Sequence, residues 1–95
     1  MSEALTVKRG FRVQGRVQGV GFRWSAARVA ESLGLKGSIR NAVDGSVEVS
    51  AEGSKETIER FERWLSEGPR GAVVQRVDVT DAELPIPDSG FKIIR

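Results

Sequence analysis

The sequence predicts an α+β domain with the element order β-α-β-β-α-β, followed by a short fifth strand. Three observations support this prediction. Apolar residues alternate along two runs typical of strands, they recur at helical spacing along two other runs, and glycine or proline separates the runs. This order favours two helices packed on one face of an antiparallel sheet, which is the ferredoxin-like sandwich, or split βαβ fold.

The first strand is predicted at residues 6–14, where apolar side chains occupy alternate positions. A helix is expected to begin near Phe22, and its apolar residues follow helical spacing: Phe22, Ala26, Val29, Ala30 and Leu33. Gly34 suits the end of this helix because glycine readily adopts the left-handed conformation found there.

The middle of the chain predicts a β-hairpin. A short second strand is expected at residues 38–41 and a third at residues 47–51, where apolar side chains again alternate. The intervening turn contains Asp44-Gly45, the strongest short-range hairpin signal.

A second helix, a fourth strand and a fifth strand complete the prediction. Ser54 is a good N-cap for a helix whose apolar face ends before Gly68-Pro69. The fourth strand is expected at residues 73–79 and the fifth at residues 91–94. They are joined by a turn-rich connection with two prolines.

The composition indicates one small domain. The chain has 95 residues, and we expect a loose tail at residues 1–5 and a single domain at residues 6–95. No apolar run approaches the roughly 20 residues of a membrane span, and no signal peptide is recognisable, so we expect a cytoplasmic protein.

The absent residue types exclude several kinds of chemistry. The sequence has no cysteine and no histidine, so it offers neither disulfides, thiol nucleophiles nor imidazole bases. We therefore expect no histidine-based zinc site, and a reaction that depends on positioning and charge.

Positive charge is concentrated in the first part of the chain. Residues 1–40 contain eight Arg or Lys against two Glu, whereas residues 41–95 contain seven against eleven acidic residues. This distribution favours an anionic ligand for the first part of the chain.

A glycine-rich run from Gly15 to Arg23 (GRVQGVGFR) connects the first predicted strand to the first helix. Backbone amides at such a junction, together with the positive end of the helix dipole, form an anion site that usually takes phosphate. Arg23 adds a planar, permanently charged group. The run matches neither the dinucleotide-binding pattern, because Trp24 stands where the third glycine belongs, nor the nucleotide P-loop.

This run closely resembles the signature loop of the acylphosphatase family. A second run, from Gly37 to Glu48 (GSIRNAVDGSVE), resembles the second signature of the same family. The resemblance covers nearly the whole chain. It implies a small ferredoxin-like hydrolase that splits acyl phosphates into a carboxylate and inorganic phosphate without metal or cofactor.

The resemblance also implies roles for individual residues. Arg23 corresponds to the phosphate-binding catalytic arginine, and Asn41 to the asparagine that orients the attacking water. The implied phosphate cradle, together with Arg23, consists of the backbone of Gly15, Arg16, Val17, Gln18, Gly19 and Val20.

The sequence departs from the family pattern at two positions. Ser38 stands where many members carry tryptophan, and we expect it to alter local packing. Ala42 lacks a hydroxyl that some members have there, which would leave Asn41 less rigidly held.

The chemistry agrees with these residue types. A carboxylate leaving group, whose conjugate acid has a pKa of about 4, departs without a general acid. In a split βαβ fold the first and second strands run parallel, so Asn41 should lie at the same sheet edge as the glycine loop. We therefore expect a monomer whose partners are a small acyl phosphate and the inorganic phosphate product, with no nucleic acid and no membrane.

Two other classes of function remain as alternatives. RNA-binding modules share this element order, but they stack bases on sheet aromatics, and here only Phe11 is aromatic in the first and third strands. The other alternative is a non-catalytic ligand-sensing domain that keeps the fold and the anion site.

Overall fold

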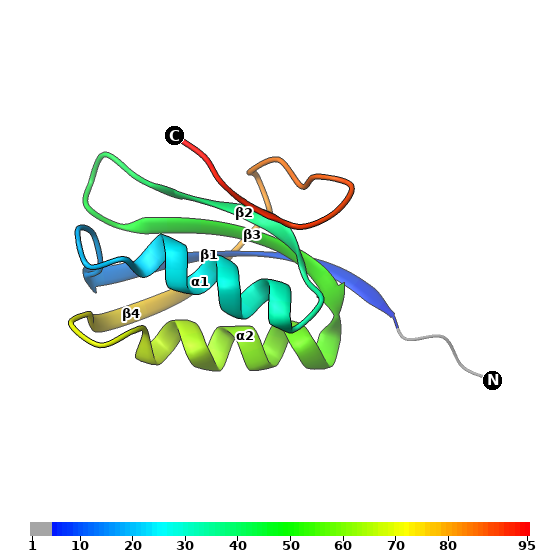
Figure 1. Cartoon of the computed structure of the whole chain (residues 1–95), viewed down its shortest axis with the longest axis horizontal. Helices are drawn as coiled ribbons and strands as arrows, with labels where there is room; N and C mark the ends of the chain where they lie inside the picture. Colours follow the sequence, from blue (N-terminus) through cyan, green and yellow to red (C-terminus); the bar gives the residue numbers. More distant parts are fainter. Residues whose placement is uncertain (1–4) are drawn as a thin grey trace.

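The computed structural model describes residues 5–95, which form a five-stranded sheet with two helices against one face (Figure 1). The elements are β1 (Thr6–Arg16), α1 (Phe22–Ser32), β2 (Lys36–Asn41), β3 (Val47–Ser54), α2 (Lys55–Glu67), β4 (Val73–Thr80) and β5 (Phe91–Ile93). The predicted order is confirmed. Residues 1–4 of the predicted tail lie outside the described residues.

The strand order across the sheet is β4-β1-β3-β2-β5. Strand β3 pairs antiparallel with both β1 and β2, so β1 and β2 run in the same direction, as predicted. Strand β5 pairs parallel with β2, so the sheet is mixed and not wholly antiparallel. The long connection after β4 makes this possible, because a parallel neighbour needs a crossover that a tight turn cannot provide.

Four strands are longer than predicted, because β1 ends at Arg16, β2 begins at Lys36, β3 ends at Ser54 and β4 ends at Thr80, whereas β5 ends one residue earlier than predicted, at Ile93. Strand β1 continues to Arg16 because Gly15, with φ 134°, passes through a bulge and still pairs with Val74 of β4. The sequence predicted that Gly15 begins the glycine-rich loop, whereas in the structure Gly15 forms the bulge within β1. Strand β2 begins at Lys36, because Gly37 packs under Phe91 and opposite Ala51.

The core lies between the sheet and the helices. Phe61 of α2 is fully buried, and its ring makes edge contacts with Phe11 of β1 at 6.4 Å and Phe91 of β5 at 5.7 Å. The predicted N-cap of α2 is confirmed, because the Ser54 hydroxyl accepts a hydrogen bond from the Thr57 amide at 3.2 Å. This core fixes both helices against the sheet.

The connection between β4 and β5 is attached to the sheet through two buried serines. The Ser38 hydroxyl donates to the Pro85 carbonyl at 2.5 Å, and the Leu84 amide donates to the Ser50 hydroxyl at 2.9 Å. Ser38 and Ser50 are paired residues of β2 and β3. Ser38 therefore anchors the connection that leads into β5.

Candidate active site

Arg23 and Asn41 line the same small pocket. Arg23 is the second residue of α1 and Asn41 is the last residue of β2. The pocket has a volume of about 150 Å³ and is lined by Val17, Gly19, Gly21, Phe22, Arg23, Trp24, Asn41 and Ile93. Pockets for drug-sized ligands begin at about 300 Å³, so this one suits a group as small as a phosphoryl group.

The N-terminus of α1 opens beside this pocket. Its N-cap is Gly21, which has φ 74° and no side chain to bond the first amides of the helix. Gly19 has φ 78°, and a Cβ atom at either glycine would meet no neighbouring atom within 4 Å. These glycines are therefore required for backbone conformation. The uncapped amides and the helix dipole favour an anion here.

Arg23 supplies the positive charge of the pocket. Its side chain is partly buried, and it takes part in none of the ion pairs found among residues 5–95. A guanidinium that no carboxylate neutralises can give its whole fork of donors to phosphate oxygens.

Asn41 supplies an acceptor. Its Oδ1 atom is buried and has no hydrogen-bond partner within residues 5–95. An unsatisfied buried amide oxygen is costly, at about 1–3 kcal/mol, so this atom is suited to accept a hydrogen bond from a bound water or substrate. In register, Asn41 lies opposite Val47 of β3, beside the hairpin turn.

Gln18 joins the glycine loop to that hairpin. Its Nε2 atom donates to the carbonyl of Ala42 at 2.9 Å and to the carbonyl of Ser46 at 2.9 Å. The resemblance assigns the backbone of Gln18 to the phosphate cradle, and the structure shows that its side chain holds Ala42, the neighbour of Asn41. Nothing in the sequence identified this contact, because its partners are backbone atoms.

The backbone beside Asn41 is held without a hydroxyl at position 42. The Ala42 amide donates to the Ser46 carbonyl at 2.8 Å, and the Ala42 carbonyl accepts from Gln18. These bonds provide a restraint that the sequence interpretation expected to be weakened by alanine at this position.

The remaining residues of the predicted cradle divide into two groups. Val17 lines the pocket and is 1% exposed, so it contributes to the floor. Gly15 and Arg16 belong to β1 and pair with β4, and Val20 packs against the core; none of these three lines the pocket. The structure therefore concentrates the site at Val17–Gly19 and the start of α1.

Four pocket residues were not assigned to the site from the sequence: Gly21, Phe22, Trp24 and Ile93. Trp24 is 61% exposed, and Ile93 of β5 is 45% exposed. Only the position of β5 beside β2 brings Ile93 to the pocket.

A series of ion pairs holds the hairpin on the face of the sheet opposite the helices. Arg12 of β1 bonds the Asp44 carboxylate at 2.7 Å and the Glu48 carboxylate at 2.9 Å, and Glu48 also bonds Arg40 at 2.7 Å. Hydrogen bonds from the side chain and backbone of Ser46 are the main cause that lowers the pKa of Asp44. Arg40 is therefore engaged with Glu48.

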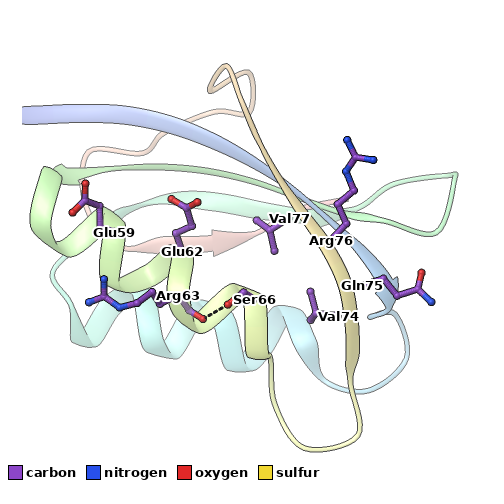
Figure 2. A pocket seen from close by; sticks show the side chains of 8 residues that line it. All are labelled: Glu59, Glu62, Arg63, Ser66, Val74, Gln75, Arg76 and Val77. Carbon is purple, nitrogen blue, oxygen red and sulfur yellow. Dashed lines mark hydrogen bonds between the residues drawn. The ribbon is translucent and has the colours of Figure 1, made fainter.

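A larger hollow lies elsewhere. It has a volume of about 580 Å³ and occupies the groove between α2 and β4 (Figure 2). Glu59 and Glu62 of α2 line it beside Arg63 and Arg76. The two carboxylates balance the two arginines in formal charge, whereas no carboxylate among residues 5–95 lines the smaller pocket.

Comparisons with known proteins find relatives over most of the chain. The acylphosphatase family model matches residues 9–93. An acylphosphatase from Thermococcus kodakarensis is 47% identical over 88 residues, which cover 93% of this chain and 96% of the relative. An acylphosphatase from Pseudomonas paraeruginosa is 55% identical over 83 residues, which cover 87% of this chain and 89% of the relative.

A solved structure shows the same likeness in three dimensions. The structure of an acylphosphatase from Coxiella burnetii superposes with a TM-score of 0.87 at 33% identity, covering 99% of this chain and 100% of that chain. The ferredoxin-like fold class is confirmed by this match.

Proposed function

The chain belongs to the acylphosphatase family and hydrolyses acyl phosphates, and on that premise we propose how its residues perform the reaction. The observation that carries the proposal is the pocket that Arg23 and Asn41 line together at the uncapped N-terminus of α1. In this proposal Arg23 binds the phosphoryl oxygens and Asn41 orients the water.

The phosphoryl group lies against Arg23 and the backbone amides between Val17 and Phe22. Arg23 donates to two phosphoryl oxygens, and the amides donate to the rest. Charge on these oxygens shifts during transfer, so fixed donors stabilise the transition state without rearranging.

The attacking water is held by Asn41. The buried Oδ1 atom accepts a hydrogen bond from the water, which directs the water oxygen's lone pair toward phosphorus. The new bond joins water oxygen to phosphorus as the bond from phosphorus to the acyl oxygen breaks. The carboxylate leaves with the bonding pair, and the proton of the water ends on the phosphate product.

Neither a metal nor a cofactor takes part in this proposal. Groups of three or more acidic, Cys or His side chains that could hold a metal ion are absent from residues 5–95, and Arg23 provides the charge. Chelator should leave the rate unchanged. A rate abolished by EDTA and restored by a divalent cation would contradict this part.

The protein acts in this proposal as a cytoplasmic monomer on a small molecule, with phosphate as the product. No helix in residues 5–95 is long and apolar enough to cross a membrane. An RNA-binding role has little support, because Phe11, the aromatic residue of β1, packs under α2 and is 1% exposed.

The test is acyl phosphate hydrolysis by paired variants. Arg23→Ala should lower kcat/KM by about 10²-fold or more, as loss of a transition-state donor does. Arg63→Ala, which removes an exposed arginine of α2, is the matched control and should keep the wild-type rate. An Arg23→Ala variant as active as the control would overturn the assignment.

Asn41→Ala separates binding from turnover. It should lose kcat while inorganic phosphate still raises its Tm as in the wild type, because the cradle remains. Loss of both the phosphate effect and turnover in a folded variant would instead assign Asn41 to phosphate binding.

A further inference from the structure

We propose that Trp24 and Ile93 form the contact surface for the acyl group and make this chain prefer acyl phosphates with aromatic or large apolar acyl groups. This inference rests on the proposed function, because it takes the phosphoryl group to lie at Arg23. It concerns the acyl group, which is the part of the substrate that the phosphate cradle does not bind.

The first step is one of size. A pocket of about 150 Å³ accommodates the phosphoryl group but leaves little space for a large acyl group beside it. The acyl group must therefore extend from the pocket toward solvent.

The second step identifies what the acyl group meets. Val17 and Phe22 are each 1% exposed and form the floor of the pocket. The two glycines have no side chain, and Arg23 and Asn41 bind the phosphoryl group and the water in the proposed function. Trp24 and Ile93, 61% and 45% exposed, are the remaining lining residues. Both are apolar, and no carboxylate lines this pocket.

The third step concerns the order of the tryptophan ring. The guanidinium of Arg28 lies 4.9 Å from the centroid of the Trp24 ring, one helical turn further along α1. This contact restrains an otherwise exposed ring. A restrained ring loses less conformational entropy when a substrate packs against it.

Other exposed apolar side chains do not share this setting. Val43, Val73 and Val79 are at least as accessible as Ile93, but none of them lines the pocket. The inference therefore depends on the combination of exposure with adjacency to Arg23.

The experiment compares benzoyl phosphate with acetyl phosphate. The ratio of their kcat/KM values should fall about tenfold in Trp24→Ala and in the same direction in Ile93→Ala, within the range expected for an aromatic contact. Val79→Ala, which trims an exposed apolar side chain of β4 outside the pocket, should leave the ratio unchanged. A ratio equal to that of the wild type in both pocket variants would overturn the inference.

A binding measurement separates this inference from the proposed function. Benzoylphosphonate and acetylphosphonate cannot be hydrolysed, so calorimetry reports recognition alone. The wild type should bind benzoylphosphonate more tightly by about tenfold, and Trp24→Ala should remove most of that difference. Equal affinities in the wild type would refute the acyl contact while leaving hydrolysis itself intact. A protein that shows the binding preference but no hydrolysis would refute the proposed function alone.

Discussion

Removing the Gln18 amide should separate the two halves of the active site. Gln18 donates from one nitrogen to Ala42 and to Ser46, so Gln18→Ala breaks two hydrogen bonds between the glycine loop and the hairpin. At about 1 kcal/mol net for each bond, the free energy of unfolding should fall by about 2 kcal/mol. That is a tolerable fraction of the 5–15 kcal/mol typical of small domains, so the variant should still fold.

The effect on catalysis should exceed the effect on folding. Misplacement of a reacting group by about 1 Å costs about 10²-fold in rate, and Ala42 is the neighbour of Asn41. We expect kcat to fall by about tenfold to hundredfold in Gln18→Ala, while phosphate still raises the Tm because the amides at α1 remain. Urea unfolding and benzoyl phosphate kinetics measure the two effects on the same samples.

A charged variant provides a sharper assay. In Gln18→Glu the carboxylate would face two carbonyl oxygens, which raises its pKa above the usual value of about 4.3. Once protonated, the acid can donate one hydrogen bond, so kcat relative to the wild type should recover as the pH falls from about 7 to 5. Gln75→Glu, on an exposed position of β4, carries the same change in charge and should show no such recovery.

Either of two results would refute the proposed role of Gln18 in positioning Asn41. If Gln18→Ala loses about 2 kcal/mol of stability but keeps the wild-type kcat, Gln18 supports the fold and does not position Asn41. If Gln18→Glu has the same relative kcat at every pH, the two carbonyl contacts do not control turnover.

Three further predictions concern stability. Gly15→Ala should lower the free energy of unfolding by about 2 kcal/mol or more, because φ is 134° and the new Cβ would clash with the Val73 carbonyl oxygen; equal urea midpoints for variant and wild type would contradict this. Asp44→Asn should reduce the decrease in the free energy of unfolding that the wild type shows at acid pH. The hydrogen bonds from Ser46 lower the pKa of Asp44 below 3.8, so the contribution of Asp44 to the free energy of unfolding is present above pH 3.8 and is lost as the pH falls below it. If urea unfolding shows the same loss of stability with falling pH in the variant and the wild type, this prediction is wrong. Phe61→Ala should cost about 3–5 kcal/mol in guanidinium unfolding, because the ring is fully buried between two other rings; a loss below about 1 kcal/mol would mean that the core repacks.

Much of the fold could be predicted from local patterns. The alternating residues of β1 and β3, the N-cap at Ser54 and the Asp44-Gly45 turn each specify a structure within a few residues. The limits of β1 and the direction of β5 could not be predicted. They depend on pairing with β4 and β2, which are distant in sequence.

For the site, the sequence by itself determined the chemical groups. Its glycines provide the backbone conformations around Gly19 and Gly21, Arg23 provides a charge, and the absence of histidine and cysteine excludes several mechanisms. The side-chain type and the local backbone conformation are properties that a short run of residues specifies.

Only the tertiary structure decided how these groups meet. The sheet order brings Asn41 to the same pocket as Arg23, the Gln18 side chain fixes the hairpin to the loop, and β5 places Ile93 at the pocket that Trp24 also lines. Each of these relations joins residues that are far apart along the chain. They form only when burial of a common core offsets the entropy of bringing the segments together, and no local pattern encodes that balance.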